Sequence, residues 1–240
     1  MHKLRSLTIF FPAYNDAKTI APLVVRVKQI AKATAKWYEI LVIDDGSTDN
    51  TRQVLAKLQQ TTPGVVVIRH PHNLGYGAAL RSGFAHARGE FVFYTDGDGQ
   101  YDPRELADLA KRMTSDVDVV NGYKRVRHDE MVRRLLGYLY NKLVHGVYRL
   151  PIRDIDCDFR LIRRELLDRF ELTASSGVIC LELILNLRDA GARFAEVPVH
   201  HFPRVHGRSR FFTLRHLWNT LTELTQVFLH ARVGTPRVVS

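Results

Sequence analysis

The stretch Phe91–Gln100 reads FVFYTDGDGQ, an apolar run followed directly by two aspartates and a glutamine. The run Phe91–Tyr94 predicts a short buried strand, because it is uniformly apolar and ends in turn-forming residues. In an extended segment, Asp96 and Asp98 can both reach one hard cation, and Gln100 could add a neutral oxygen. Oxygen-only ligands suit Mg²⁺ or Mn²⁺, which also bind substrate phosphates. The stretch therefore predicts a strand that ends in a metal site.

Short apolar runs alternate with helical stretches through the rest of the first half. Further strands are predicted at Leu7–Phe11, Glu39–Ile43, Val65–Ile68 and Val117–Val120. Helices are predicted between them, at Ala17–Ala35, Thr51–Gln60, Ala78–Ala87 and Pro103–Met113. This order of elements is typical of an α/β fold with a doubly wound, mostly parallel sheet flanked by helices.

Polar residues also follow the first two strands. Pro12-Ala13-Tyr14-Asn15-Asp16 follows the first strand, and Asp44-Asp45-Gly46-Ser47 follows the second. An isolated Asp-Asp-Gly-Ser sequence is usually a turn and a helix cap. Ligands of open parallel sheets, however, bind outside the carboxyl ends of the strands, which is where all these segments meet. Carboxylates at three strand ends exceed what turns require, so we expect a binding site at this edge.

The best-known nucleotide-binding motifs are missing from the sequence. It contains no Gly-x-x-x-x-Gly-Lys-Ser/Thr, which argues against a P-loop enzyme. Asn73–Gly77 (NLGYG) precedes a predicted helix, but Leu80 stands where a dinucleotide fingerprint has its third glycine. Gly75 and Gly77 could still let the backbone approach a ligand closely, with Arg81 one helical turn later.

The second half of the chain contains two amphipathic helical stretches. Met131–Tyr148 and Phe211–His230 each place apolar residues at helical spacing, with basic residues beside them. Their apolar sides could pack against the core, or they could lie in a membrane interface. Another helix is predicted at Leu181–Ala190 and a strand at Ala195–His201. We find no signal-peptide core and no apolar run long enough to span a membrane.

The 240 residues carry a formal net charge of +10, from 35 Lys and Arg against 25 Asp and Glu. An apolar content of 45% excludes a polybasic tail protein. The excess charge could serve nucleic acid, a membrane surface or a phosphorylated substrate. Nucleic acid is disfavoured, because the basic residues accompany no zinc pattern, RNP-like strand or helix-turn-helix signature. Two cysteines, Cys157 and Cys180, cannot build a disulfide framework, which favours a reducing compartment.

Four motifs together resemble family 2 glycosyltransferases with the GT-A fold: PAYND at 12–16, DDGSTD at 44–49, NLGYG at 73–77 and DGDGQ at 96–100. Two later segments, DIDCDFR at 154–160 and EVPVHHFPRVHGRSR at 196–210, resemble the branch that makes dolichyl- and polyprenyl-phosphate sugars. The resemblance implies an inverting, metal-dependent hexosyltransferase with a UDP- or GDP-linked sugar donor.

The resemblance also implies a role for each matching residue. Residues from both halves of the chain would bind the nucleotide sugar: Pro12, Tyr14, Asp16, Asp44, Asp45, Asp96, Arg204, Ser209 and Arg210. The first three would line the nucleoside pocket, and Asp44 and Asp45 would contact the base and ribose. Asp96, Asp98 and Gln100 would hold Mg²⁺ or Mn²⁺ on the diphosphate. Asp98 would also act in catalysis, with Asp154 and Arg160 on the acceptor side.

The acceptor decides which groups the mechanism needs. A polyprenyl phosphate is already ionised near neutral pH, so the enzyme must position it with cations more than deprotonate it. The candidates to bind this phosphate are Arg125, Arg127, Arg133 and Arg160. A sugar or other hydroxyl acceptor would instead need a carboxylate base within hydrogen-bond reach. Four carboxylates are available for that role: Asp154, Asp156, Asp158 and Glu182.

We therefore expect a GT-A domain over residues 1–210, followed by an amphipathic helix and tail over residues 211–240. Beyond Val197 the single acidic residue is Glu223, whereas the aspartates of the first half gather at the strand ends. This distribution suits a metal-bound diphosphate on one side and a lipid phosphate at an anionic membrane on the other. The expected partners are a nucleotide-diphosphate sugar, a polyprenyl phosphate and the cytoplasmic face of a membrane, and not nucleic acid.

Overall fold

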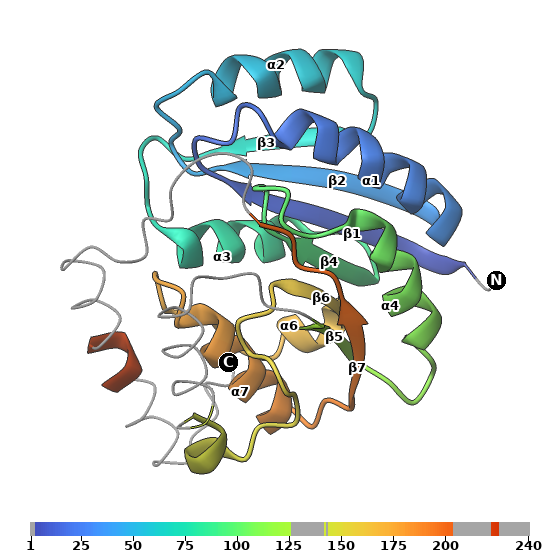
Figure 1. Cartoon of the computed structure of the whole chain (residues 1–240), viewed down its shortest axis with the longest axis vertical. Helices are drawn as coiled ribbons and strands as arrows, with labels where there is room; N and C mark the ends of the chain where they lie inside the picture. Colours follow the sequence, from blue (N-terminus) through green and yellow to red (C-terminus); the bar gives the residue numbers. More distant parts are fainter. Residues whose placement is uncertain (1–2, 126–141, 143, 204–221, 226–240) are drawn as a thin grey trace.

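The computed structural model describes residues 3–125, 142, 144–203 and 222–225. Within these residues the chain forms a seven-stranded sheet in the order β3-β2-β1-β4-β6-β5-β7, flanked by helices on both faces (Figure 1). The strands are β1 (Leu4–Ala13), β2 (Ala35–Asp44), β3 (Val65–Arg69), β4 (Phe91–Thr95), β5 (Val119–Lys124), β6 (Phe159–Arg163) and β7 (Phe194–Val199). The helices are α1 (Ile20–Thr34), α2 (Thr51–Thr61), α3 (Tyr76–His86), η1 (Pro103–Glu105), α4 (Leu106–Arg112), α6 (Arg164–Leu167) and α7 (Ile179–Asp189).

The strands and helices predicted in the first half are confirmed, with bounds that shift by a few residues. β3, β2, β1 and β4 are parallel neighbours, as the alternation of strands and helices predicts. The α/β fold class, with a mostly parallel sheet flanked by helices, is therefore correct. At the start of η1, Asp102 accepts a hydrogen bond from the backbone N–H of Arg104 at 3.0 Å and so caps this helical turn.

β6 is the strand that the sequence analysis did not predict. It pairs antiparallel with β4 on one side and with β5 on the other. Its sequence, FRLIR, has two arginines in five residues, which hides the apolar signal of a central strand. Because β6 runs against its neighbours, its first residue lies at the edge where β4 ends, and Thr95 is paired with Phe159.

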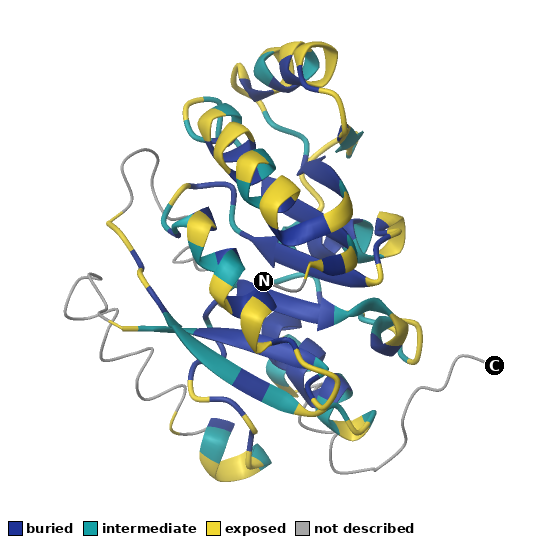
Figure 2. Cartoon of the chain, turned by 90° about the vertical axis from the view of Figure 1, so that its right-hand side faces the viewer, coloured by how far each residue is buried: buried dark blue, intermediate teal, exposed yellow. Residues whose placement is uncertain are grey.

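The strands bury side chains on both faces, so successive residues belong to different cores. Ile9 and Phe11 of β1 lie in the core beneath α1, α2 and α4. Phe10, between them, lies in the core beneath α3 and α7. Figure 2 shows the central strands as mostly buried ribbons between helices whose outer surfaces are exposed. Burying one large apolar side chain contributes about 1.5–3 kcal/mol, which explains why the sheet holds the strand ends in a fixed arrangement.

The two predicted amphipathic helices fall mostly outside the described residues. The parts that are described pack against the protein: Val144 is buried in the core beneath α7, and Tyr148 and Leu224 pack at its margin. The predicted boundary at residue 210 also lies outside the described residues, so it stays a prediction. No helix of the described part is both long and apolar enough to cross a membrane.

Candidate active site

The loops after β1, β2 and β4 meet at one edge of the sheet, as the sequence predicts. Ala13, the last residue of β1, is paired with Asp44, the last residue of β2. The backbone N–H of Asp45 donates to the carbonyl of Ala13 at 2.9 Å, and that of Gly97 donates to the carbonyl of Pro12 at 3.2 Å. Main-chain hydrogen bonds therefore join the three loops around the central strand β1.

Asn15 connects the loop after β1 to the loop after β2. Its φ of 60° lies in the left-handed region, which Asn adopts more readily than most residues. Its N–H donates to Ser47 Oγ at 3.0 Å, and its side-chain oxygen accepts from the N–H groups of Thr48 and Asp49 at 2.8 and 3.2 Å. No role was predicted for Asn15, although an Asn in a loop is a common signal of such a turn.

A cavity of about 450 Å³ lies between the same two loops. Its lining residues come from both loops: Asn15, Asp16, Ala17, Lys18, Thr19, Asp49 and Asn50. Asp16, predicted to bind the nucleoside, lines this cavity, and its Oδ2 accepts from the N–H of Tyr14 at 3.0 Å. Pro12 is buried and Tyr14 half-buried, and neither is among the lining residues. The volume is within the range of small-molecule sites.

Asp44 and Asp45 are buried, with 3% and 4% of their surface exposed. Asp44 Oδ1 shapes the turn after β2 by accepting a backbone N–H three residues later at 3.0 Å. Asp45 Oδ1 accepts from His70 Nδ1 at 2.7 Å and from the N–H of Leu74 at 2.8 Å. Asp45 Oδ2 accepts from the N–H of Gly75 at 3.0 Å. Both oxygens of Asp45 thus hold the loop before α3, which argues against its predicted contact with a base or ribose.

The predicted metal ligands lie in the loop after β4. Asp96 is half-buried, and its Oδ1 accepts from the hydroxyl of Tyr76 at 2.9 Å. Asp98 is buried, and its Oδ1 accepts from the N–H of Gln100 at 3.0 Å. Gln100 Nε2 donates to the carbonyl of Phe202 at 3.0 Å, which directs the amide nitrogen toward the segment after β7. Tyr76 was not among the predicted site residues, because a tyrosine at a helix start carries no metal signal.

The arrangement fits a cation that is shared with a substrate. Among the described residues, no three His, Cys, Asp or Glu side chains come close enough together to hold a metal ion. Mg²⁺ in phosphate-transfer sites is typically held by one or two carboxylates, with substrate phosphates and water as the remaining ligands. Asp96 and Asp98 supply two carboxylates of this kind, and the oxygen-only donor set suits Mg²⁺ or Mn²⁺.

The glycines at the start of α3 approach protein backbone instead of a ligand. The N–H of Gly77 donates to the carbonyl of Ser175 at 2.8 Å, and a Cβ at Gly77 would lie 2.1 Å from the carbonyl oxygen of Ala174. Gly75 has a φ of 97°, and a Cβ there would lie 2.7 Å from the carbonyl oxygen of Ser175. Arg81 Nη1 donates to the carbonyls of residues 173 and 174. The close approach predicted here is real, but its partner is the segment before α7.

The acceptor-side motif reaches the same edge through the reversed direction of β6. Asp154 is buried, and its Oδ2 accepts from the N–H of Lys124 at 3.4 Å. Asp158 is half-buried, and its Oδ1 accepts from Cys180 Sγ at 3.0 Å. Burial and the negative charges of Asp158 and Asp96 raise the pKa of Tyr76 well above its ordinary value, so its hydroxyl remains a donor at neutral pH.

Arg160 lies inside the protein, which corrects the prediction that it contacts a phosphate. It is fully buried. Its guanidinium donates to Asn121 Oδ1 and the Tyr94 hydroxyl, and to the carbonyls of Ile155 and Cys157 at 2.9 and 3.2 Å. A buried cation is tolerated only when its donors are satisfied, and here the protein itself satisfies them. Arg160 therefore fixes the segment before β6 and does not reach the edge itself.

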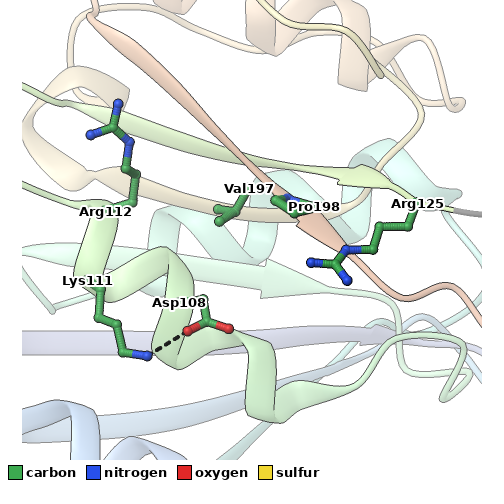
Figure 3. A pocket seen from close by; sticks show the side chains of 6 residues that line it. All are labelled: Asp108, Lys111, Arg112, Arg125, Val197 and Pro198. Carbon is green, nitrogen blue, oxygen red and sulfur yellow. Dashed lines mark hydrogen bonds and ion pairs between the residues drawn. The ribbon is translucent and has the colours of Figure 1, made fainter.

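Arg125 is exposed directly after β5 and lines a second cavity, of about 370 Å³. The other residues around this cavity come from α4 and β7: Asp108, Lys111, Arg112, Val197 and Pro198 (Figure 3). Lys111 Nζ is paired with Asp108 at 2.7 Å. Most of the charged side chains around this cavity are basic, and β7 contributes an apolar surface to it. Arg127, Arg133, Arg204, Ser209 and Arg210, predicted to bind phosphates or the nucleotide sugar, lie outside the described residues.

Comparison with known proteins shows to which family the chain belongs. Residues 8–170, more than half of the chain, match the profile described as glycosyl transferase family 2. The chain belongs to glycosyl transferase family 2. The matched region of this family 2 glycosyltransferase runs from within β1 to beyond β6, and so contains the loops that carry Asp16, Asp96, Asp98 and Asp154.

Solved structures resemble this family 2 glycosyltransferase over nearly its whole length. Glucosyl-3-phosphoglycerate synthase from Mycobacterium tuberculosis, in complex with Mn²⁺, UDP and phosphoglyceric acid, has a TM-score of 0.72 at 19% identity, over 95% of this chain and 78% of that chain. The same enzyme in complex with UDP has a TM-score of 0.68 at 21% identity, over 95% and 80%. At such identities the likeness shows the fold, and it confirms the predicted GT-A class.

Proposed function

We propose that this family 2 glycosyltransferase moves a sugar from a nucleotide diphosphate to a polyprenyl phosphate, with inversion at the anomeric carbon. The observation that carries the proposal is the order of the loops along one edge. The cavity beside Asp16 lies between the loops after β2 and β1, Asp96 and Asp98 follow on β4, and the 154–158 segment precedes β6. A donor can thus extend from the cavity to the carboxylates, with the acceptor arriving from the far side.

Asp96 and Asp98 are the residues that would hold Mg²⁺ or Mn²⁺ on the donor diphosphate. A cation bound there would neutralise the charge that develops on the leaving nucleotide diphosphate. The chain supports this role by placing Asp98 in a buried turn and by fixing Asp96 with the Tyr76 hydroxyl. The complexes of glucosyl-3-phosphoglycerate synthase with Mn²⁺ and UDP lend the proposal support from a protein of the same fold.

The phosphate acceptor is favoured by the groups near β5. Arg125 is exposed at the end of β5, so its guanidinium can pair with a phosphate. Because this side chain is exposed, its charge is not buried and unpaired when no phosphate is bound. A phosphate oxygen is ionised near neutral pH, so the reaction needs this positioning more than it needs a base. The net charge of +10 also favours association with an anionic membrane surface, where a polyprenyl phosphate resides. We accordingly propose a peripheral location on the cytoplasmic face of a membrane.

A hydroxyl acceptor is the second candidate, because the segment before β6 is rich in carboxylates. Asp158 directly precedes Phe159, which is paired with Thr95 of β4, and Asp154 and Asp156 contact Lys124 at the end of β5. One of these carboxylates could accept a proton from an attacking hydroxyl. The solved complex with phosphoglyceric acid belongs to an enzyme of this fold that acts on a small acceptor.

An acceptor panel separates the two candidates. Purified protein would be incubated with labelled UDP- and GDP-linked sugars and Mn²⁺, with a short-chain polyprenyl phosphate, the matching polyprenol, or 3-phosphoglycerate as acceptor. We expect labelled lipid with the phosphate and none with the polyprenol. A product with 3-phosphoglycerate alone would favour the hydroxyl candidate, and no product with any donor and acceptor would contradict the proposed function.

A further inference from the structure

The segment before α7 is held by α7 itself, because Glu182 accepts from Thr173 and from the N–H of Ala174, and it is also held from two further sides. We call residues 173–178 the α7 loop. On one side its carbonyl groups accept from Gly77 and Arg81 of α3. On the other side it meets Glu223, which is far away in the sequence. Leu224, the next residue, packs at the margin of the core beneath α7. The α7 loop is therefore enclosed between the start of α3 and a segment near the end of the chain.

Glu223 binds the α7 loop through four hydrogen bonds. Its Oε1 accepts from the N–H and the hydroxyl of Ser175 at 3.0 and 2.5 Å. Its Oε2 accepts from the N–H and the hydroxyl of Ser176 at 3.1 and 2.5 Å. Each carboxylate oxygen thus fixes one serine, and hydrogen bonds to a charged acceptor are stronger than neutral ones. The carboxylate fixes the backbone of two successive residues, which sets the position of the Ser175 carbonyl.

The contacts continue from the α7 loop to the metal ligands. The Ser175 carbonyl accepts from the N–H of Gly77, in the first turn of α3. The preceding residue, Tyr76, donates its hydroxyl to Asp96 Oδ1 at 2.9 Å. Both glycines lie too close to the α7 loop for any larger residue, so the loop and the turn are in direct backbone contact. A continuous set of contacts therefore joins Glu223 to Asp96.

We propose that Glu223 is a positioning residue for the cation site: by fixing the α7 loop against the first turn of α3, it places the Tyr76 hydroxyl on Asp96 and so orients that carboxylate. The inference rests on the proposed function, since it takes Asp96 as a metal ligand. Groups that hydrogen-bond to a metal ligand without touching the metal commonly change metal affinity when they are removed. Tyr76 is such a group for Asp96, and Glu223 acts through it.

The experiment measures Mn²⁺ binding, not turnover. Bound Mn²⁺ would be followed by electron paramagnetic resonance in the presence of a nucleotide. UDP and GDP are first compared with the wild type, and the one that strengthens Mn²⁺ binding more is used for every variant. We expect Tyr76→Phe to weaken Mn²⁺ binding about tenfold, the low end of the range for groups that hydrogen-bond to a metal ligand. Glu223→Gln should weaken it by a smaller factor, between about two and ten. Glu171→Gln, the same change at an exposed residue near the α7 loop, should have no effect.

The double variant Tyr76→Phe with Glu223→Gln distinguishes positioning from general stability. If Glu223 acts through Tyr76, the double variant binds Mn²⁺ no more weakly than Tyr76→Phe alone. If the losses of Mn²⁺ affinity in the two single variants multiply in the double variant, the inference is overturned. A Glu223→Gln variant with wild-type Mn²⁺ affinity would also overturn it. Should Glu223→Gln fail to fold, Ser175→Ala with Ser176→Ala removes the two hydroxyl donors and is measured in its place. Wild-type protein that binds no Mn²⁺ with either nucleotide would contradict the proposed function itself, and the inference with it.

Discussion

Thr95, the last residue of β4, is paired with Phe159, the first residue of the antiparallel strand β6. This pairing brings together two segments that lie more than sixty residues apart in the sequence. Asp96 directly follows Thr95, and Asp158 directly precedes Phe159, so two carboxylates from different halves of the chain emerge from neighbouring strands at the same edge. A parallel β6 would have placed Asp158 at the opposite edge of the sheet.

Replacement of Arg160 should lower the free energy of unfolding of the protein. Arg160→Ala leaves the Tyr94 hydroxyl, Asn121 and two backbone carbonyls without their buried donor. Breaking such a buried charged network costs about 3 kcal/mol or more. Urea denaturation followed by circular dichroism measures the free energy of unfolding. Arg125→Ala is the control: it should change stability by less than about 0.5 kcal/mol, because Arg125 is exposed. Equal stability of both variants would show that Arg160 has no structural role.

Gly77→Ala should disrupt the contact between α3 and the α7 loop. The added Cβ would lie 2.1 Å from the carbonyl oxygen of Ala174, which is backbone and must move. We expect a loss of about 1–3 kcal/mol from overpacking, and a lower rate of sugar transfer. Gly146→Ala is the matched helical control, since nothing lies within 4 Å of its added Cβ. That variant should be unchanged or gain up to about 1 kcal/mol from helix propensity. A stable, fully active Gly77→Ala would contradict the close packing described here.

Both cysteines should be unreactive in the folded protein. Burial, with a contribution from Asp154, raises the pKa of Cys157 to about 12. Burial and Asp158 raise the pKa of Cys180 well above its ordinary value. The thiolate is the reactive form, so iodoacetamide at pH 8 should leave the native protein unmodified and add two groups per chain in guanidinium chloride. Mass spectrometry reads the number of groups added, and rapid modification of native protein would show that one thiol is accessible.

The ion pair between Asp118 and Arg193 should contribute to acid sensitivity. Arg193 donates to both oxygens of Asp118, at 2.8 and 3.0 Å, and these bonds lower the pKa of Asp118 despite its burial. A lowered pKa in the folded state stabilises the protein above the ordinary Asp pKa of about 3.9, and this contribution is lost as the pH falls through the lower folded value. Free energies of unfolding at pH 7 and pH 3 should therefore differ less in Arg193→Ala than in the wild type. An unchanged difference would exclude this pair as a source of acid sensitivity.

Local sequence patterns were sufficient to predict the fold of the first half. Runs such as Leu7–Phe11 and Phe91–Tyr94 are apolar throughout because parallel strands are covered on both faces, and that signal is local. β6 lacks it. Arg160 is the second residue of this central strand, and its burial depends on Asn121 and Tyr94, which the sequence does not place beside it. A buried arginine cannot be recognised before its partners are known.

The site was predictable to the extent that ligands follow strand ends. Asp16, Asp96 and Asp98 lie where the strand–loop pattern puts them. Asp45 shows the limit of this rule: it also follows a strand, but the N–H groups of the loop before α3 occupy its oxygens. Tyr76 is the opposite case: it does not follow a strand, but its hydroxyl contacts Asp96. That contact depends on how α3 approaches β4, and no local motif indicates it.

The rate of sugar transfer by Asp98→Asn, compared with the wild type in the presence of Mn²⁺, tests the central claim most directly. The change keeps the size of a buried side chain and the oxygen that accepts from the N–H of Gln100, while it removes a negative charge from the cation site. We predict that the variant melts close to the wild-type temperature and transfers sugar to polyprenyl phosphate at least about a hundredfold more slowly, because loss of a direct ligand should cost no less than the hundredfold upper limit for groups that only support one. A folded Asp98→Asn variant with the wild-type rate would contradict a cation held by Asp96 and Asp98.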